Sequence, residues 1–348
     1  MAKEDKYVLH LLKGKCYERQ NAYNQAIIQY KQAMAEIRKR DVNITDFVGQ
    51  IQFHLGWGIV RYNVDIQSGL THLRQANKLI PNFPELIVKL AGVLYSDLGD
   101  AQDIAESKEL LNACVDQHPD SFDALLMQGK ILYQSEEWPA AATALDQAIQ
   151  VQISDPAVNG QPKASTYYYA GLCFEKVKNL KKALNLFKQC LQLDSTHMSA
   201  CMHLATVLAN QGEVDRAQKY YNHALKLDVN SISANYGLGM VLYKHGNNKE
   251  DSVAHFERII TNDPAHYKAL TQLGVIYLEQ NDIEKAADII KRSIKVNKNY
   301  PLSLVTFGNL CFELGESEKA IRYYQRALRL NENDIKAFTG LANAYYDI

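Results

Sequence analysis

This 348-residue sequence has few prolines and cysteines, and its formal net charge is only -1. Eight prolines, sparse glycine and no low-complexity tract leave little room for a long linker or a disordered tail. The six cysteines occur singly, without a C-x-x-C pair, and most fall in apolar helical patterns, where a thiol behaves as a small hydrophobe. We therefore expect a reducing compartment and predict a cytoplasmic location, with a nuclear or ciliary one left open.

Long apolar runs are missing as well. The start, MAKEDKYVLHLLKGK, lacks the apolar core of a secretory signal, and no stretch approaches the roughly 18 apolar residues of a spanning helix. We expect no membrane insertion. The 38 basic and 39 acidic side chains nearly cancel, so we expect no direct binding of nucleic acid. The 21 tyrosines leave stacking on single-stranded nucleic acid as an alternative, which this charge balance weakens.

Common sequence motifs of catalysis, cofactor binding and metal binding are also missing. The chain has no H-E-x-x-H, G-x-x-x-x-G-K-[ST] or G-x-S-x-G motif. His197 and His203 are six residues apart and do not share a helical face, and the glycines at 237 and 239 lack the third glycine of a dinucleotide loop. We therefore expect no catalytic residue, no cofactor and no metal, although a site built from distant residues stays an alternative.

A period of about 34 residues is the strongest positive signal. Small residues that precede an apolar or aromatic residue by three positions recur at separations of 34, 34, 35, 34 and 34: Gly171, Ala205, Gly239, Gly274, Gly308 and Ala342. After the first five, a second small residue follows twelve or thirteen positions later, and a bulky one three or four beyond that. This spacing predicts two antiparallel helices per unit, which cross closely at the small residues while bulky side chains fill the spaces beside them.

Earlier in the chain the same pattern persists with looser spacing. The sequence predicts nine complete helix pairs and the first helix of a tenth, near 7–40, 49–83, 84–121, 122–155, 164–197, 198–231, 232–266, 267–300, 301–334 and 335–348. Two connections, at 38–49 and 154–163, are longer than the others.

These units resemble the tetratricopeptide repeat. Leu273, Gly274, Tyr277 and Ala286 match the first half of its consensus, Ala320, Tyr324 and Ala327 the second half, and Pro81, Pro119 and Pro264 its terminal proline. The resemblance covers essentially the whole chain. It implies an all-α, right-handed superhelical solenoid of about nine helix-turn-helix repeats plus one unpaired first helix, forming a single domain over 1–348.

The resemblance also implies a binding surface, because first helices line the concave side of the solenoid in this family. Positions two, five, nine and twelve of each first helix form one stripe at helical spacing. On this basis we expect an extended peptide or a helix of a partner protein to contact Tyr168, Met202, Tyr236, Met240, Tyr243, Thr271, Asn309 and Asn343. Replacing Tyr168 and Tyr236 by Ala should then weaken capture and leave the thermal midpoint nearly unchanged.

Several alternatives stay open at this point. The stripe residues could pack on one another, with the partner bound on the convex side or on the two long connections. The carboxylate-binding set of chaperone-binding members is absent, with Lys130 and Asn309 as isolated matches, and the asparagine ladder of the N-acetylglucosamine-transferring enzyme is absent too.

The chain stops near the end of a first helix, so we expect a further chain or a partner to cover Leu341, Ala342 and Tyr345. We interpret the protein as a non-enzymatic scaffold of a multiprotein assembly. The alternative is a substrate-docking or regulatory arm of a larger enzyme whose catalytic domain lies outside this chain.

Overall fold

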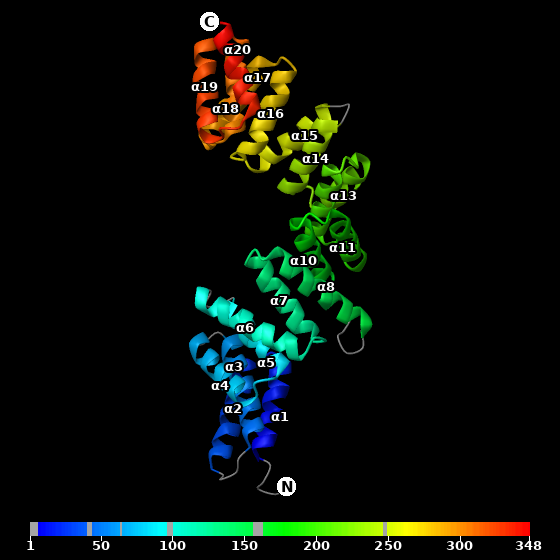
Figure 1. The fold of residues 1–348 in the computed structure, drawn as a ribbon, viewed down its shortest axis with the longest axis vertical. Helices are drawn as coiled ribbons and strands as arrows, with labels where there is room; N and C mark the ends of the chain where they lie inside the picture. Colours follow the sequence, from blue (N-terminus) through cyan, green and yellow to red (C-terminus); the bar gives the residue numbers. More distant parts are fainter. Residues whose placement is uncertain (1–5, 40–43, 63–64, 96–99, 156–162, 246–248) are drawn as a thin grey trace. The chain divides into compact units, whose positions relative to one another are not determined.

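The computed structural model describes residues 6–39, 44–62, 65–95, 100–155, 163–245 and 249–348. Over these ranges it contains nineteen α-helices and no strand, so the predicted all-α class is confirmed (Figure 1). Of the two predicted long connections, residues 40–43 and 156–162 lie outside the described residues, and the first is shorter than expected because a helix already begins at Thr45.

The helices follow one another as packed pairs. In the first part of the chain these are α1 (Lys6–Arg19) with α2 (Tyr23–Arg38), α3 (Thr45–Tyr62) with α4 (Ile66–Leu79), α5 (Pro84–Val93) with α6 (Ala101–Gln117), α7 (Phe122–Gln134) with α8 (Trp138–Ser154), and α10 (Ala164–Lys176) with α11 (Leu180–Leu193).

The second part continues in the same way. Its pairs are α12 (Met198–Asn210) with α13 (Val214–Leu227), α14 (Ile232–His245) with α15 (Lys249–Asn262), α16 (Tyr267–Glu279) with α17 (Ile283–Val296), and α18 (Pro301–Glu313) with α19 (Ser317–Leu330), followed by α20 (Ile335–Tyr346).

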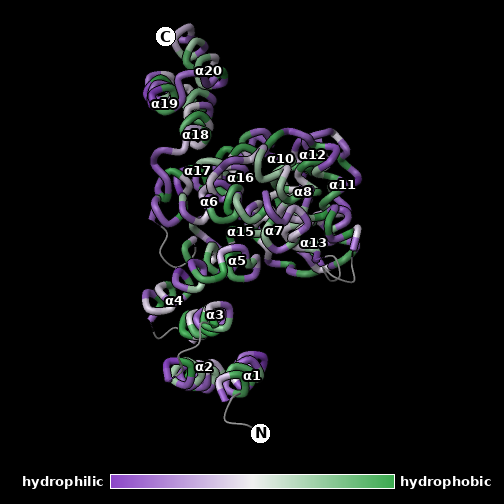
Figure 2. The backbone as a smooth tube through the Cα atoms, turned by 60° about the horizontal axis from the view of Figure 1, so that its bottom comes forward, coloured by the Kyte–Doolittle hydropathy of each residue, from purple (hydrophilic) through white to green (hydrophobic). Residues whose placement is uncertain are grey.

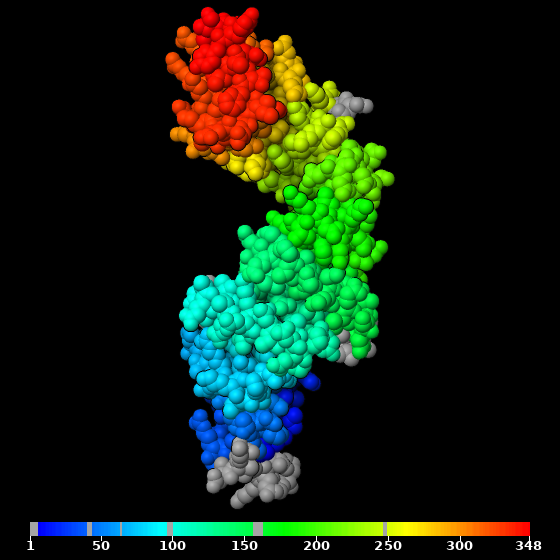
Figure 3. Space-filling view, in the orientation of Figure 1, coloured from blue at the N-terminus to red at the C-terminus, as the bar shows by residue number. Residues whose placement is uncertain are grey.

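The chain divides into two compact units, residues 1–193 and 194–348. Figure 3 shows their surfaces, the first from blue to green and the second from green to red. Each is a stack of helix pairs in which a pair contacts the next one along the chain. A single continuous solenoid over the whole chain stays a prediction.

Several helices, α17 and α19 among them, are strongly amphipathic, and the tube in Figure 2 carries both hydrophilic and hydrophobic colours. In α19, for example, Ala320, Tyr324 and Ala327 are buried at helical spacing, whereas Arg322 and Gln325 between them are exposed. Such a helix is stable only against a neighbour that covers its apolar stripe.

Close packing within several pairs depends on glycine, but differently from the expectation. A Cβ added at Gly171 would lie 2.6 Å from the ring of Phe187, and one at Gly274 would lie 2.3 Å from Ile290. The bulky side chain therefore sits directly over the glycine, rather than to one side of a glycine–alanine crossing. The same arrangement joins Gly14 to Tyr30.

In the six pairs whose turn the structure describes, one turn residue lies in the left-handed region, and in two of them it is Glu136 or Lys178. Gly212 and Gly315 have φ of 80° and 72°, and Asn21 and Asn281 have φ of 58° and 62°. Glycine adopts this conformation without strain, and asparagine tolerates it better than most residues.

Helix α20 packs against α18 and α19 through Ala337, Ala344 and the partly buried Leu341. Leu341 thus has a surface to pack on, contrary to the expectation. Tyr345 is 56% exposed, and its hydroxyl accepts a hydrogen bond of 2.9 Å from Gln325. None of the helices in the described part of the chain is long and apolar enough to cross a membrane.

Candidate binding hollows

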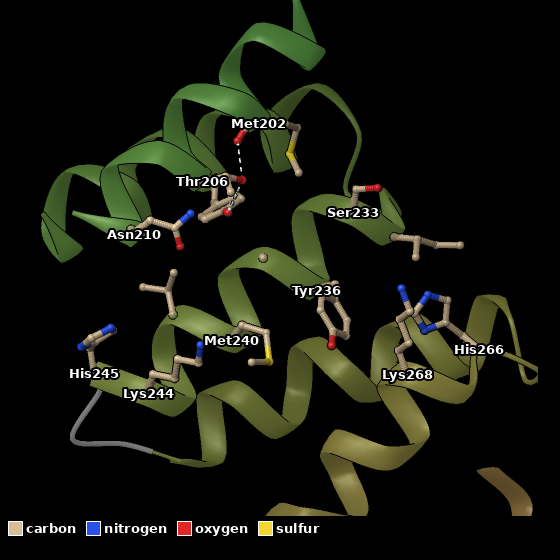
Figure 4. A pocket seen from close by; sticks show the side chains of 15 residues that line it. Met202, Thr206, Asn210, Ser233, Tyr236, Met240, Lys244, His245, His266 and Lys268 are labelled. Atoms are coloured by element: carbon tan, nitrogen blue, oxygen red, sulfur yellow. Dashed lines mark hydrogen bonds between the residues drawn. The ribbon is translucent and has the colours of Figure 1, made fainter. Parts of the chain in front are cut away.

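A hollow of about 510 Å³ lies along α12 and α14, which are the first helices of two successive pairs. Figure 4 shows Met202 and Thr206 on α12 and Tyr236 and Met240 on α14 around it. Three of the eight predicted binding residues, Met202, Tyr236 and Met240, are therefore brought together in one cavity. We call it the α12–α14 hollow.

One wall of this hollow depends on Gly237. A Cβ at Gly237 would lie 2.4 Å from the ring of Tyr221, so only glycine allows this ring to reach across from α13. The Tyr221 hydroxyl lies 2.9 Å from the hydroxyl of Thr206, which also contacts the carbonyl oxygen of Met202 at 2.9 Å. Burial raises the pKa of Tyr221, so its phenol stays neutral at physiological pH.

The side chain of Tyr236 lines the hollow and also packs against the core. Its ring centroid is 5.6 Å from that of Phe256 in an edge-to-face arrangement and 6.0 Å from that of His266. Burial raises the pKa of Tyr236. Because one side of the ring packs on the buried Phe256, replacing Tyr236 by Ala should also lower stability, contrary to the expectation of an unchanged midpoint.

Basic side chains surround the hollow. Lys244 and His245 at the end of α14 and Lys268 in α16 line it, together with His266, and its lining contains no Asp or Glu. His266 Nδ1 accepts a hydrogen bond of 3.1 Å from the backbone N–H of Ala269 and so caps α16. This cap explains one histidine that the sequence left without a role.

The expectation for Thr271 has to be corrected. Its side chain is fully buried, and its hydroxyl lies 2.8 Å from the carbonyl oxygen of Tyr267 and 2.7 Å from the hydroxyl of Ser293. A threonine in a helix commonly bonds back to the preceding turn in this way. Thr271 therefore holds α16 against α17 and presents no group to a partner.

The other predicted residues lie outside the α12–α14 hollow. Tyr243 is half-buried, and its hydroxyl donates a hydrogen bond of 2.5 Å to Glu279. Asn309 is exposed, but its side-chain oxygen accepts a hydrogen bond of 2.7 Å from Tyr324. Asn343 is exposed on α20. Tyr168 belongs to the first compact unit, where its ring packs on Phe187 at 6.2 Å.

A second hollow, of about 660 Å³, lies in the first unit along α3, α5 and α7, and we call it the α3–α7 hollow. Trp57, Val88 and Lys130 line it. Sequence reasoning missed it because the stripe was read only from the fifth unit onward. Trp57 is at position nine of the second unit, Val88 at position five of the third and Lys130 at position nine of the fourth. Extending the stripe to these units would therefore have predicted all three residues.

Among the residues that the structure describes, neither hollow brings together a group of possible metal ligands. In the described part of the chain, no three His, Cys, Asp or Glu side chains come together as metal ligands would. The buried Cys173 and Cys201 have pKa values raised by burial, to about 12 and about 11, and are therefore poor nucleophiles at neutral pH.

Comparison with known sequences agrees with this repeat architecture. A family described as "TPR repeat" matches residues 308–348. One family described as "Tetratricopeptide repeat" matches 176–238. Another with the same description matches 96–162 and 246–302. The helix pairs and these matches define a helical repeat protein. The chain belongs to the tetratricopeptide repeat superfamily.

Individual relatives are more distant. The chain is 23% identical over 221 residues to anaphase-promoting complex subunit 3 of Schizosaccharomyces pombe, which is 64% of this chain and 31% of that protein. It is 26% identical over 214 residues to the human protein O-mannosyl-transferase TMTC1, which is 62% of this chain and 22% of that protein. The chain thus spans less than a third of either relative.

Among solved structures, a tetratricopeptide repeat protein from Parabacteroides merdae superposes with a TM-score of 0.56 at 16% identity. The match covers 75% of this chain and 98% of the bacterial one. At this identity the likeness supports the fold and says nothing about partners.

Proposed function

We propose that this chain is a non-enzymatic protein-interaction scaffold of a multiprotein assembly, and that the α12–α14 hollow holds an extended peptide or the apolar face of a helix. The observation that carries the proposal is the meeting of Met202, Tyr236 and Met240, from two successive first helices, in one cavity. Methionine adapts its shape to different ligands, and a half-buried tyrosine offers a rigid apolar wall with a polar end. The distant relative that is named as a subunit of a complex supports the same class of function.

The sharpest test changes apolar character without changing size. Gln is unbranched like Met and favours helices, so Met202→Gln and Met240→Gln remove apolar lining while preserving the backbone. We expect each to weaken capture of the natural partner from cell extract by about tenfold. Met198→Gln is the matched control, because Met198 begins the same helix but does not line the hollow. Equal binding by all three variants would contradict the proposal.

A second measurement locates the contact directly. Ser233 is exposed and lines the hollow, so a photo-crosslinking amino acid at this position should attach to the bound partner. The same amino acid at the exposed Lys226, on α13 and outside the lining, should attach much less. A melting curve of each variant separates lost binding from lost structure.

A second candidate is a substrate-docking arm of a larger enzyme. It is favoured by the match to a protein that is named as a transferase and of which this chain covers 22%. Sequencing of the full-length transcript separates the candidates, because a catalytic domain encoded in frame with this chain would favour the arm.

A further inference from the structure

The α3–α7 hollow, like the α12–α14 hollow, has an apolar lining with basic side chains around it. Its floor is aliphatic: Val60 on α3, Val88 and Val93 on α5, and Met127 and Ile131 on α7 line it. Val93 and Ile131 are buried and continue into the core beneath. Because α3, α5 and α7 all belong to the first compact unit, the hollow is contained within that unit.

Three basic residues, Arg61, Lys89 and Lys130, also line the hollow, and no acidic side chain lines it. Lys89 pairs with Glu85 at 2.8 Å, and Glu85 itself lies outside the lining. In the described ranges of the chain, Arg61 and Lys130 have no carboxylate within ion-pair distance. The hollow therefore offers two cations whose charge the described residues do not neutralise.

Lys130 is held in place rather than loose in solvent. Its ammonium lies 5.5 Å from the ring centroid of Tyr169, and burial lowers its pKa. The nearby Lys163 lowers the pKa further, and Asp123 opposes both effects. A partly desolvated ammonium gains more from a carboxylate than an exposed one does, because the low dielectric strengthens their attraction.

Trp57 supplies the aromatic wall. Lys89 Nζ lies 4.9 Å and Arg61 Cζ 5.7 Å from the centroid of its ring. These contacts position both cations at the edge of the aliphatic floor.

We propose that the α3–α7 hollow binds an acidic peptide segment, in which a bulky apolar side chain enters the aliphatic floor and Asp or Glu residues on either side pair with Arg61 and Lys130. A volume of about 660 Å³ accommodates a few side chains. The inference goes beyond the proposed function, because it gives the chain a second partner site, with a stated class of ligand, in the other compact unit.

A nucleic acid is the less suitable occupant. Strand binding uses aromatic faces that are free to stack on bases, but the ring of Trp57 is already covered by cations of the protein itself. The aliphatic side chains of the floor also have no hydrogen-bond donor or charge that could bind a phosphate. Single-stranded RNA is therefore a competing outcome of the test.

Trp57 provides a reporter for the test, because the sequence has only two tryptophans. Trp138 lies outside the hollow and packs edge-to-face on Tyr133, so Trp138→Phe keeps an aromatic ring there and leaves Trp57 as the single emitter. The full chain with this change is titrated with an array of short peptides in which one Leu, Phe or Met is flanked by Asp and Glu. A matched array carries Lys in place of the acids, and oligouridylate is the third titrant.

We expect the acidic array to contain peptides that shift the Trp57 emission, with binding that weakens as salt rises. Arg61→Gln and Lys130→Gln should each lower the affinity of the best peptide about tenfold. Lys181→Gln, an exposed change on α11, should have no effect. Melting curves confirm that each variant is folded.

No response to any acidic peptide would overturn the proposal, as would equal binding of the Lys array or stronger binding of oligouridylate. Since the second unit contains no tryptophan, binding in the α12–α14 hollow does not produce this signal. Met202→Gln should leave the response unchanged, so failure of one proposal does not imply failure of the other.

Discussion

The ring of Tyr324 fills the space that a side chain at Gly308 would need. A Cβ added at Gly308 would lie 2.6 Å from Tyr324 Cε1, closer than real Cβ contacts allow. Tyr324 is 1% exposed, and its hydroxyl donates a hydrogen bond of 2.7 Å to Asn309, so the ring is fixed at both ends. The contact therefore sets the distance between α18 and α19.

We predict that Gly308→Ala destabilises the protein by about 1–3 kcal/mol, because the ring or the helix has to move to make room. Gly92→Ala is the matched control. There the new Cβ would meet only the terminal methyl of Met127, at 3.3 Å, and the better helix propensity of Ala should make the change neutral or stabilising by up to about 1 kcal/mol. Urea unfolding of both variants measures the difference, and an equal effect would contradict the packing argument.

Glu18 is the centre of a partly buried polar cluster in the first unit. Its carboxylate accepts hydrogen bonds of 2.7 Å from Tyr30 and 2.9 Å from His54. Burial acts to raise the pKa of Glu18, but the hydrogen bonds of His54 and Tyr30 outweigh it and lower this pKa. A lowered carboxyl pKa stabilises the fold above the ordinary pKa of glutamate, and the stabilisation is lost as pH falls through the lowered value.

We therefore expect Glu18→Gln to reduce the free energy of unfolding by about 1.5–3 kcal/mol at neutral pH, with the loss shrinking as pH falls below about 4. Glu36→Gln is the control, since Glu36 pairs with the exposed Lys39 in the same helix turn and should show no measurable effect. Urea unfolding at several pH values gives both curves. A Glu18→Gln penalty that persists unchanged in acid would show that the charge is not responsible.

The helix pairs were predictable because their signal repeats. Gly274, Ala286 and Ile290 have equivalents one period away in Gly308, Ala320 and Tyr324, and a repeated spacing is hard to produce by chance. The detail of the contact was not predictable, because spacing alone does not say which bulky side chain lies over the glycine.

The binding surface was less predictable, because position in a helix does not fix burial. Thr271 occupies the same position five as Tyr236, but its small side chain is covered by Ser293 of α17, whereas the longer Tyr236 reaches both Phe256 and the hollow. Side-chain length and the neighbouring helix decide such cases. The α3–α7 hollow was missed for a different reason, because Trp57 and Lys130 lie in units before the fifth, where the stripe was not followed.

Cysteine accessibility gives a third prediction. Cys16 is exposed, and the other five cysteines are buried. Burial shields the Cys311 thiol from the reagent and raises its pKa to about 11. Little of it is therefore present as the reactive thiolate. Iodoacetamide at mildly alkaline pH should modify Cys16 in the native protein and the remaining thiols only in urea, as peptide mass spectrometry would show. Rapid native modification of Cys311 would contradict the packing of α18 described above.

The repeat organisation itself can be tested by deletion. Helices α16 and α17 form one pair between 267 and 300, and removal of the whole pair joins α15 to α18. In α18, Leu304 and Phe307 hold the positions that Leu270 and Leu273 hold in α16, and all four are buried. Because the incoming helix carries similar side chains at the same places, it should pack where α16 packed.

Deletion of 267–300 should therefore leave a helical chain that melts cooperatively at a somewhat lower temperature. Deletion of 267–282 alone removes α16 but keeps α17, whose buried Ala286 and Ile290 then lose their cover. We expect this half deletion to aggregate, because an apolar stripe is left exposed to water. Circular dichroism and light scattering on the two proteins distinguish the outcomes. If both deletions collapse alike, the helix pair is not the unit that adds and removes stability, and the boundaries at 267 and 300 are misplaced.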